Sequence, residues 1–138
     1  MKIMAIDYGD ARTGIALSDL LCSIVGSTTV IHSRNSEKTL NEICRIAKEN
    51  DVREIAMGLP KNMDGTEGFR AEATYKFAKR LGEIYDGRIE FVDERLTTVG
   101  ASQFLNATNT RGGKRKDVID TVSACLILET YMKRKNNS

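Results

Sequence analysis

The order of hydrophobic segments constrains this chain more than any other sequence feature. Three short apolar runs rich in β-forming residues come first, separated by turns of hairpin length. After them, segments with helical periodicity alternate with further apolar runs. The expected strands cover residues 2–7, 13–18, 27–32, 53–60 and 88–95. The expected helices begin at Ser36 as N-cap, at Phe69, near Thr97 or Thr98 and at residue 117, and the last runs to residue 134.

The resulting order, β-β-β-α-β-α-β-α-α, predicts an α/β fold with a mixed five-stranded sheet flanked by helices. No repeat or linker interrupts the pattern, so we expect residues 1–138 to form one domain. In sheets of this kind, ligands gather outside the carboxyl ends of the parallel strands. Asp7 and Glu94 both lie at the carboxyl end of an apolar strand. The pattern therefore places two acidic residues where a site is expected.

The composition indicates the kind of cellular environment in which the chain is expected. Hydrophobic residues make up 41% of the chain and charged residues 29%, as in an ordinary soluble protein. We find neither a membrane-spanning run nor a signal peptide, so we expect a cytoplasmic protein with no membrane partner. The three cysteines are widely spaced and form no C-x-x-C pair. Reduced, packed cysteines are the expectation.

Histidine is nearly absent, which limits the chemistry available. His32 is the only histidine, and a histidine metal cage or a Ser-His-Asp triad is therefore poorly supported. Magnesium prefers oxygen ligands, so two or three carboxylates with substrate phosphates suffice to hold it. Two such ions, about 3.5–4 Å apart, can activate water and stabilise the leaving oxygen in phosphodiester cleavage.

Each acidic cluster offers more than one candidate ligand. Asp7 is preferred over Asp10, because Asp7 lies at a rigid strand end and Asp10 in a loop. Asp93 and Glu94 point to opposite faces of a straight strand, which leaves the choice between them open.

A second pair of acids lies at the start of the last expected helix. Asp117 and Asp120 share one side of that helix. Asp117 is placed to serve as its N-cap, which makes Asp120 the stronger candidate ligand.

Four motifs, in order along the chain, resemble the YqgF family. They are Asp7-Tyr8-Gly9 with Arg12 and Gly14-Ile15-Ala16, Gly58-Leu59-Pro60 with Asn62-Met63-Asp64-Gly65-Thr66, Asp93-Glu94-Arg95-Leu96-Thr97-Thr98, and Asp120-Thr121-Val122-Ser123-Ala124. This family comprises bacterial pre-16S rRNA nucleases, also described as Holliday junction resolvases, with a ribonuclease H-like fold. The resemblance implies that Asp7, Glu94 and Asp120 bind the metal, Mg²⁺ or Mn²⁺ in a two-ion site, and are catalytic.

Cations and hydroxyls near these acids are candidates for binding nucleic acid. Cations can offset the repulsion between carboxylates and phosphates, and a helix start can seat a phosphate oxygen. The run at residues 111–116 is expected to form a flexible basic clamp loop. The candidates are Arg12, Lys61, Asn62, Arg95, Thr97, Thr98, Arg111, Lys114, Arg115 and Lys116.

We therefore expect a metal-dependent endonuclease acting on structured nucleic acid, with pre-16S ribosomal RNA as the leading substrate. A Holliday junction resolvase acting on branched DNA is the alternative, and would require a symmetric homodimer where an RNA nuclease could be a monomer. A non-catalytic nucleic-acid-binding module is a further alternative. Half of a sugar-kinase or actin-like ATPase is disfavoured, because such enzymes need two domains and no Walker motif is present.

Overall fold

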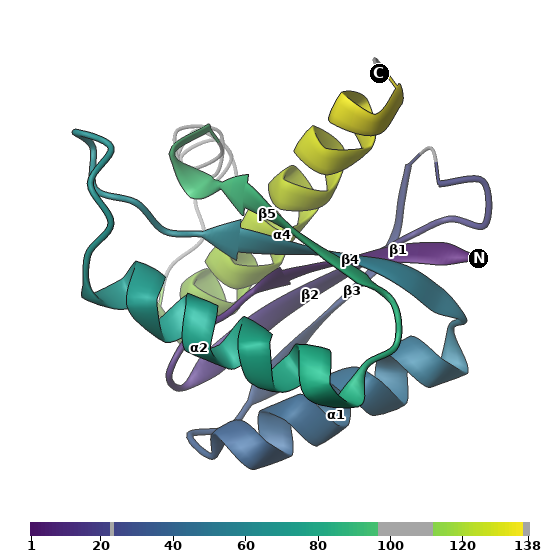
Figure 1. Cartoon of the computed structure of the whole chain (residues 1–138), viewed down its shortest axis with the longest axis horizontal. Coiled ribbons are helices and arrows are strands. Elements are labelled where there is room, and N and C mark those ends of the chain that lie inside the picture. Colours follow the sequence, from purple (N-terminus) through teal and green to yellow (C-terminus); the bar gives the residue numbers. More distant parts are fainter. Residues whose placement is uncertain (23, 97–111, 137–138) are drawn as a thin grey trace.

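A computed structural model describes residues 1–22, 24–96 and 112–136 of the chain (Figure 1). The strands are β1 (Lys2–Asp7), β2 (Arg12–Ser18), β3 (Val25–His32), β4 (Val52–Leu59) and β5 (Arg88–Asp93). The helices are α1 (Ser36–Glu49), α2 (Phe69–Ile84) and α4 (Gly112–Asn136), with a short 3₁₀ turn, η1 (Glu94–Leu96), after β5. The predicted α/β fold is confirmed over these residues.

The strands form one mixed sheet in the order β3-β2-β1-β4-β5. The first three strands are antiparallel neighbours, and β1, β4 and β5 run parallel to one another. The carboxyl ends of β1, β4 and β5 therefore meet at one edge of the sheet.

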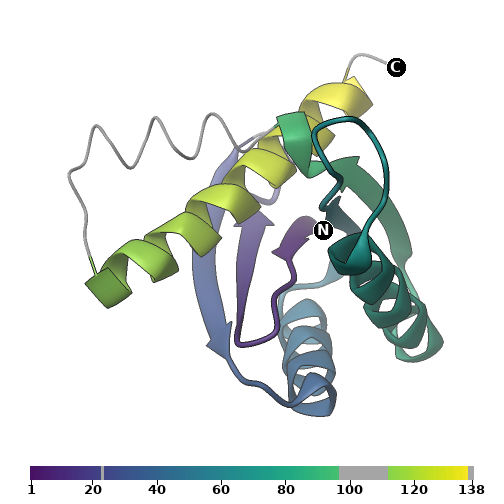
Figure 2. The ribbon, with the colours of Figure 1, turned by 90° about the vertical axis from the view of Figure 1, so that its left-hand side faces the viewer.

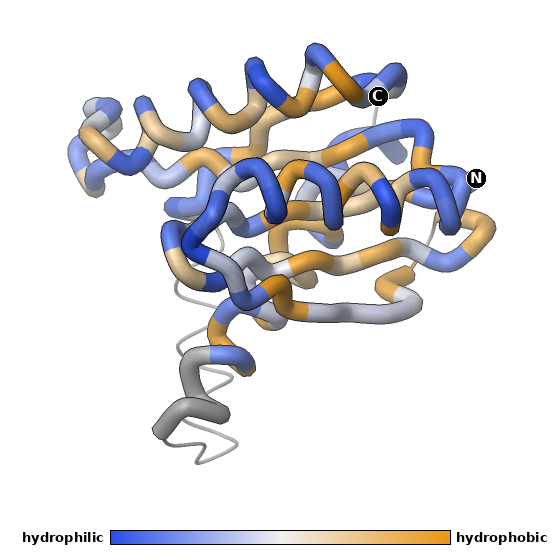
Figure 3. The backbone as a smooth tube through the Cα atoms, turned by 90° about the horizontal axis from the view of Figure 1, so that it is seen from below, coloured by the Kyte–Doolittle hydropathy of each residue, from blue (hydrophilic) through white to orange (hydrophobic). Residues whose placement is uncertain are grey.

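Helices cover both faces of the sheet, with α1 and α2 on one face and α4 on the other (Figure 2). Alternate strand residues enter the two cores: Met4 and Ile6 pack with α1 and α2, whereas Ile3 and Ala5 pack against α4. Hydrophobic and hydrophilic stretches alternate along the helical segments of the backbone tube (Figure 3), as expected for helices with one face on a sheet.

Helix α4 lies close to the sheet because the strand residues beneath it are small. Ala5, Ala16 and Ala56 are fully buried in this core. At Gly14 of β2 a Cβ atom would lie 2.2 Å from the backbone oxygen of Asp120. Glycine is therefore required there if α4 is to bring Asp120 to the sheet.

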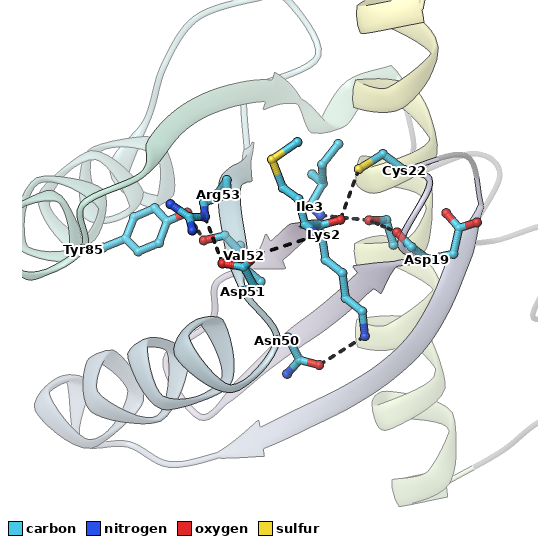
Figure 4. A network of polar contacts seen from close by, with 11 residues as sticks. Lys2, Ile3, Asp19, Cys22, Asn50, Asp51, Val52, Arg53 and Tyr85 are labelled. Atoms are coloured by element: carbon cyan, nitrogen blue, oxygen red, sulfur yellow. Dashed lines mark hydrogen bonds and ion pairs between the residues drawn. The ribbon is translucent and has the colours of Figure 1, made fainter.

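Polar contacts join the amino-terminal ends of β1 and β4, away from the carboxyl ends (Figure 4). The Tyr85 hydroxyl donates to the Val52 carbonyl at 3.0 Å. Lys2 Nζ donates to Asn50 Oδ1 at 3.3 Å, and the Ile3 amide donates to Ser18 Oγ at 2.8 Å. These contacts tie the starts of β1 and β4 to their neighbours at the edge opposite the carboxyl ends.

Two predicted helix starts are wrong. The N-cap of α1 is Asn35 and not Ser36, because the Asn35 side chain accepts from the Lys38 amide. Helix α4 begins at Gly112, so residues 112–116 are helical and not loop, and Asp117 is no N-cap. Helix propensity is a weak guide that context overrides, so the paired glycines do not end this helix.

Other differences are smaller. Strand β5 ends at Asp93, so Glu94 belongs to η1 and not to a straight strand. Phe69 begins α2 as predicted, but it is exposed, whereas Phe77 is buried. The helix expected near residues 97–106 lies outside the described residues.

None of the described helices is both long and apolar enough to cross a membrane.

Substitution Gly14→Ala tests the close approach of α4. The new methyl group must displace α4 or β2, and overpacking of this kind costs about 1–3 kcal/mol of unfolding free energy. Gly82→Ala is the matched control: its Cβ would meet only Ile89 Cδ1, at 3.9 Å, and alanine in a helix gains about 0.5–1 kcal/mol over glycine. Urea unfolding measures both. A Gly14→Ala protein as stable as wild type would contradict the packing.

Candidate active site

Three acidic side chains reach the carboxyl edge of the parallel strands from three elements. Asp7 ends β1, and Glu94 directly follows β5, whose last residue Asp93 pairs in register with Leu59 of β4. Asp120 comes from α4, where it lies against Gly14 on β2. Gly14 in turn pairs with Asp7 in the sheet register. The acids thus meet at the carboxyl edge, on the face of the sheet that α4 covers.

A cleft of about 510 Å³ opens at this edge. Its walls are Asp7, the turn that follows β1, the first two turns of α2 and Asp120 of α4. The lining residues are Asp7, Tyr8, Gly9, Asp10, Ala11, Arg12, Phe69, Arg70, Ala73, Thr74 and Asp120.

The carboxyl group of Asp7 interacts with three charged groups at the cleft, Glu94, Asp120 and Arg70. Its carboxyl group shares a side-chain hydrogen bond with Glu94. Burial raises the Asp7 pKa well above its ordinary value, and the Glu94 hydrogen bond and the charges of Glu94 and Asp120 raise it further. Arg70 acts in the opposite direction. Negative charge is therefore crowded at the buried end of β1.

The Glu94 side chain occupies space that β4 leaves open, because residue 58 has no side chain. A Cβ on Gly58 would lie 2.8 Å from Glu94 Oε1 and 2.4 Å from Ile127 Cδ1. Asp93 is engaged elsewhere, since Arg95 donates to it from Nη2 at 2.6 Å and from Nε at 2.9 Å. Arg95 lowers the Asp93 pKa through these bonds. The geometry favours Glu94 over Asp93 as the partner of Asp7.

Asp120 faces the cleft, and Asp117 is not among its lining residues. Arg12 Nε donates to Asp120 Oδ2 at 2.8 Å. Burial raises the Asp120 pKa, and the bond from Arg12 partly offsets that rise. Asp117 instead lies 3.3 Å from Nε2 of His32. Of the two acids, Asp120 is the one whose charge acts on Asp7.

The donor set fits a divalent cation by its chemistry. All three groups are carboxylates, the ligands that a hard cation prefers. Burial is the main cause of the raised Asp7 pKa, and the charges of Glu94 and Asp120, which such a cation would offset, raise it further. Among the described residues, no three acids, histidines or cysteines are arranged to hold a metal together. Asp7 and Glu94 bind each other, and Asp120 binds Arg12. Metal binding by this triad stays a prediction.

The predicted nucleic-acid ligands near the cleft all make contacts within the chain. Arg12 and Arg95 hold Asp120 and Asp93. Lys61 Nζ lies 3.8 Å from Glu67 Oε1, and the Asn62 side chain donates to Thr66 Oγ1 at 2.9 Å. For these four residues too, contact with nucleic acid stays a prediction.

The remaining predicted ligands belong to the segment after η1. Thr97, Thr98 and Arg111 lie outside the described residues. Lys114, Arg115 and Lys116 are on the first turns of α4. For all six residues, contact with nucleic acid stays a prediction.

Sequence reasoning missed two cleft residues, Phe69 and Arg70 of α2. Both are exposed on the cleft wall, and the charge of Arg70 acts on Asp7. One sequence signal could have found them. Both residues begin the helix that follows β4 and its loop. Such positions face the carboxyl edge of the sheet.

Comparison with known proteins gives full-length matches. A family model described as "RuvX: Holliday junction resolvase" matches residues 1–134. A protein from Halothermothrix orenii is 41% identical over 99% of this chain and 97% of its own. One from Carboxydothermus hydrogenoformans is 40% identical over the full length of both. Each of these two relatives is named "Putative pre-16S rRNA nuclease".

Solved structures show the same fold at low sequence identity. Thermus thermophilus RuvC, in complex with a Holliday junction substrate, aligns with a TM-score of 0.66 at 6% identity. The alignment covers 100% of this chain and 97% of RuvC. Fowlpox virus resolvase, in complex with Holliday junction DNA, aligns with a TM-score of 0.60 at 12% identity, covering 98% and 99%. The mixed five-stranded sheet is thus that of the RuvC-like resolvases.

The raised pKa of Asp7 predicts a pH-dependent effect of Asp7→Asn on stability. Because the folded protein binds the Asp7 proton more tightly than the unfolded chain, wild type loses stability as pH rises from 3.8 through the folded pKa. The Asn variant lacks this loss. Its melting temperature in EDTA should therefore gain on that of wild type as pH rises. Asp10→Asn, at an exposed carboxylate of the same cleft, is the control, and a pH-independent difference for Asp7→Asn would contradict the prediction.

Proposed function

The chain belongs to the RuvX family of Holliday junction resolvases, and from that premise we propose that it is a divalent-metal-dependent nuclease acting on structured nucleic acid. The leading substrate is the 5′ end of pre-16S ribosomal RNA. The observation that carries the proposal is the convergence of Asp7, Glu94 and Asp120 beside one cleft. Full-length relatives named for pre-16S rRNA cleavage support the choice of substrate.

In this proposal Asp7, Glu94 and Asp120 hold Mg²⁺ or Mn²⁺, with two ions as the favoured number. The bound cation supplies the charge that activates water and stabilises the leaving oxygen of a phosphodiester. For the carboxylates to act together, Asp7 must be ionised, although burial and the charges of Glu94 and Asp120 raise its pKa. Arg12 must also release Asp120. Arg12 and Arg70 then offer two cations at the cleft to the substrate phosphates.

Cleavage of branched DNA is the second candidate, favoured by the family description and by the fold shared with junction resolvases. This candidate also requires a particular oligomeric state. A resolvase that cuts two opposed strands needs two sites related by symmetry, whereas trimming of an RNA end needs one. Oligomeric state measured together with cleavage therefore separates the candidates.

A side-by-side cleavage assay tests the proposal. Purified protein is given a precursor 16S rRNA fragment or a four-way DNA junction, with Mg²⁺, Mn²⁺ or EDTA. We expect metal-dependent turnover of the RNA, reduced at least about 100-fold in Asp7→Asn, Glu94→Gln and Asp120→Asn, because loss of a ligand weakens the metal by more than loss of its supporting contacts.

Asp93→Asn and Asp117→Asn are the matched controls, since each removes an acid adjacent to a proposed ligand. They should retain far more activity than the three ligand variants. Turnover of the junction alone would favour the second candidate. Binding without turnover of either substrate would indicate a nucleic-acid-binding module and overturn the proposal.

A further inference from the structure

Phe69 is an aromatic side chain that the fold leaves uncovered at the cleft. It is 81% exposed, although burial of a phenylalanine is worth about 1.5–3 kcal/mol. Its ring contributes to the wall of the cleft that also contains Asp7 and Asp120. Within the described part of the chain, no ring contact offsets the cost of exposing an aromatic side chain at this place.

The core of α2 does not use Phe69. The helix buries Ala71, Thr74, Phe77, Ala78 and Leu81 against the sheet. Phe69 is nine residues before Ala78, which places it on the opposite side of the helix. Phe77, by contrast, stacks on Tyr8 with ring centroids 4.0 Å apart. The two phenylalanines of α2 therefore differ in role.

The position of Phe69 directs it toward the acids. It is the first residue of α2, and helical side chains lean toward the amino terminus. The next residue is Arg70, an exposed cation whose charge reaches Asp7. An aromatic ring and a cation side by side match the two parts of a nucleotide, since a base stacks on the ring and a phosphate pairs with the cation.

We infer that Phe69 stacks on an unpaired base next to the phosphodiester that is cleaved, so that the strand in the cleft is single-stranded or locally opened. This inference rests on the proposed function and specifies its substrate. In a closed duplex the faces of the bases are covered by their neighbours and cannot stack on a side chain. Phe69 is thus a positioning residue that selects against closed duplex.

Binding measurements on the full chain test this inference. The probes are hairpins with an unpaired segment, made as RNA and as DNA, and a closed duplex of the same length, all with Ca²⁺ as the divalent cation. We expect Phe69→Ala to bind the unpaired probes about 5- to 150-fold more weakly, the range of one base–aromatic stack, and the duplex nearly as wild type does. Phe69→Trp should restore binding.

An abasic scan separates stacking from a general structural effect. Removal of one base at a time from the unpaired segment should, at one position, weaken wild type but leave Phe69→Ala unchanged. Ile84→Ala is the matched control, an exposed apolar residue at the far end of α2, and should respond to the scan as wild type does. Weaker binding of Phe69→Ala to the RNA probes alone supports the inference and shows that the site requires ribose. Weaker binding to both the RNA and the DNA probes supports it and shows that either sugar is accepted.

Failure of the stacking inference and failure of the proposed function give different results. If wild type binds and cleaves unpaired probes while Phe69→Ala binds them equally well, the stacking inference is wrong and the proposed function stands. An abasic effect that is the same in wild type and Phe69→Ala also overturns it. If wild type binds no nucleic acid of any kind, the proposed function itself fails.

Discussion

Crowding of negative charge at the end of β1 governs the rest of the site. Asp7 ends a central strand with neighbours on both sides, and the charges of Glu94 and Asp120 act on its carboxyl group. In the structure this repulsion is relieved in two ways, by a hydrogen bond between Asp7 and Glu94 and by the ion pair of Asp120 with Arg12. Both are contacts that a bound cation would replace.

Small residues make this crowding possible. Gly14 lets α4 bring Asp120 to the sheet, and Gly58 gives Glu94 the space to turn toward Asp7. Alanines beneath α4 keep the helix close along its length. The positions of the candidate ligands therefore depend on glycines and alanines, whose side chains carry no reactive group. The positions of the acids and the packing of the fold are parts of one arrangement.

Local pattern predicted much of this from sequence. Strand β1 was expected over residues 2–7 and ends at Asp7, because a continuous apolar run next to a glycine turn leaves few alternatives. The start of α4 was missed, since paired glycines beside a basic run resemble a loop. The choice between Asp93 and Glu94 depended on the family resemblance. In the structure it rests on contacts from Arg95 and on the space above Gly58.

Long-range contacts were beyond sequence reasoning. Arg12 and Asp120 are 108 residues apart, and no local pattern indicates that Arg12 would pair with a candidate ligand. The sequence predicts a helix that begins at Phe69, but of the two phenylalanines in that helix only Phe77 is buried. Whether an aromatic residue faces the core or the cleft depends on how the helix packs.

The central claim is that Asp7, Glu94 and Asp120 together hold a divalent cation. Crystals of the protein grown with Mn²⁺ and measured for anomalous scattering test it most directly. The account predicts an anomalous peak in contact with all three carboxylates, with Arg12 displaced from Asp120 and the Asp7–Glu94 hydrogen bond gone. A saturating Mn²⁺ concentration that leaves both contacts intact and gives no peak at the cleft would contradict it.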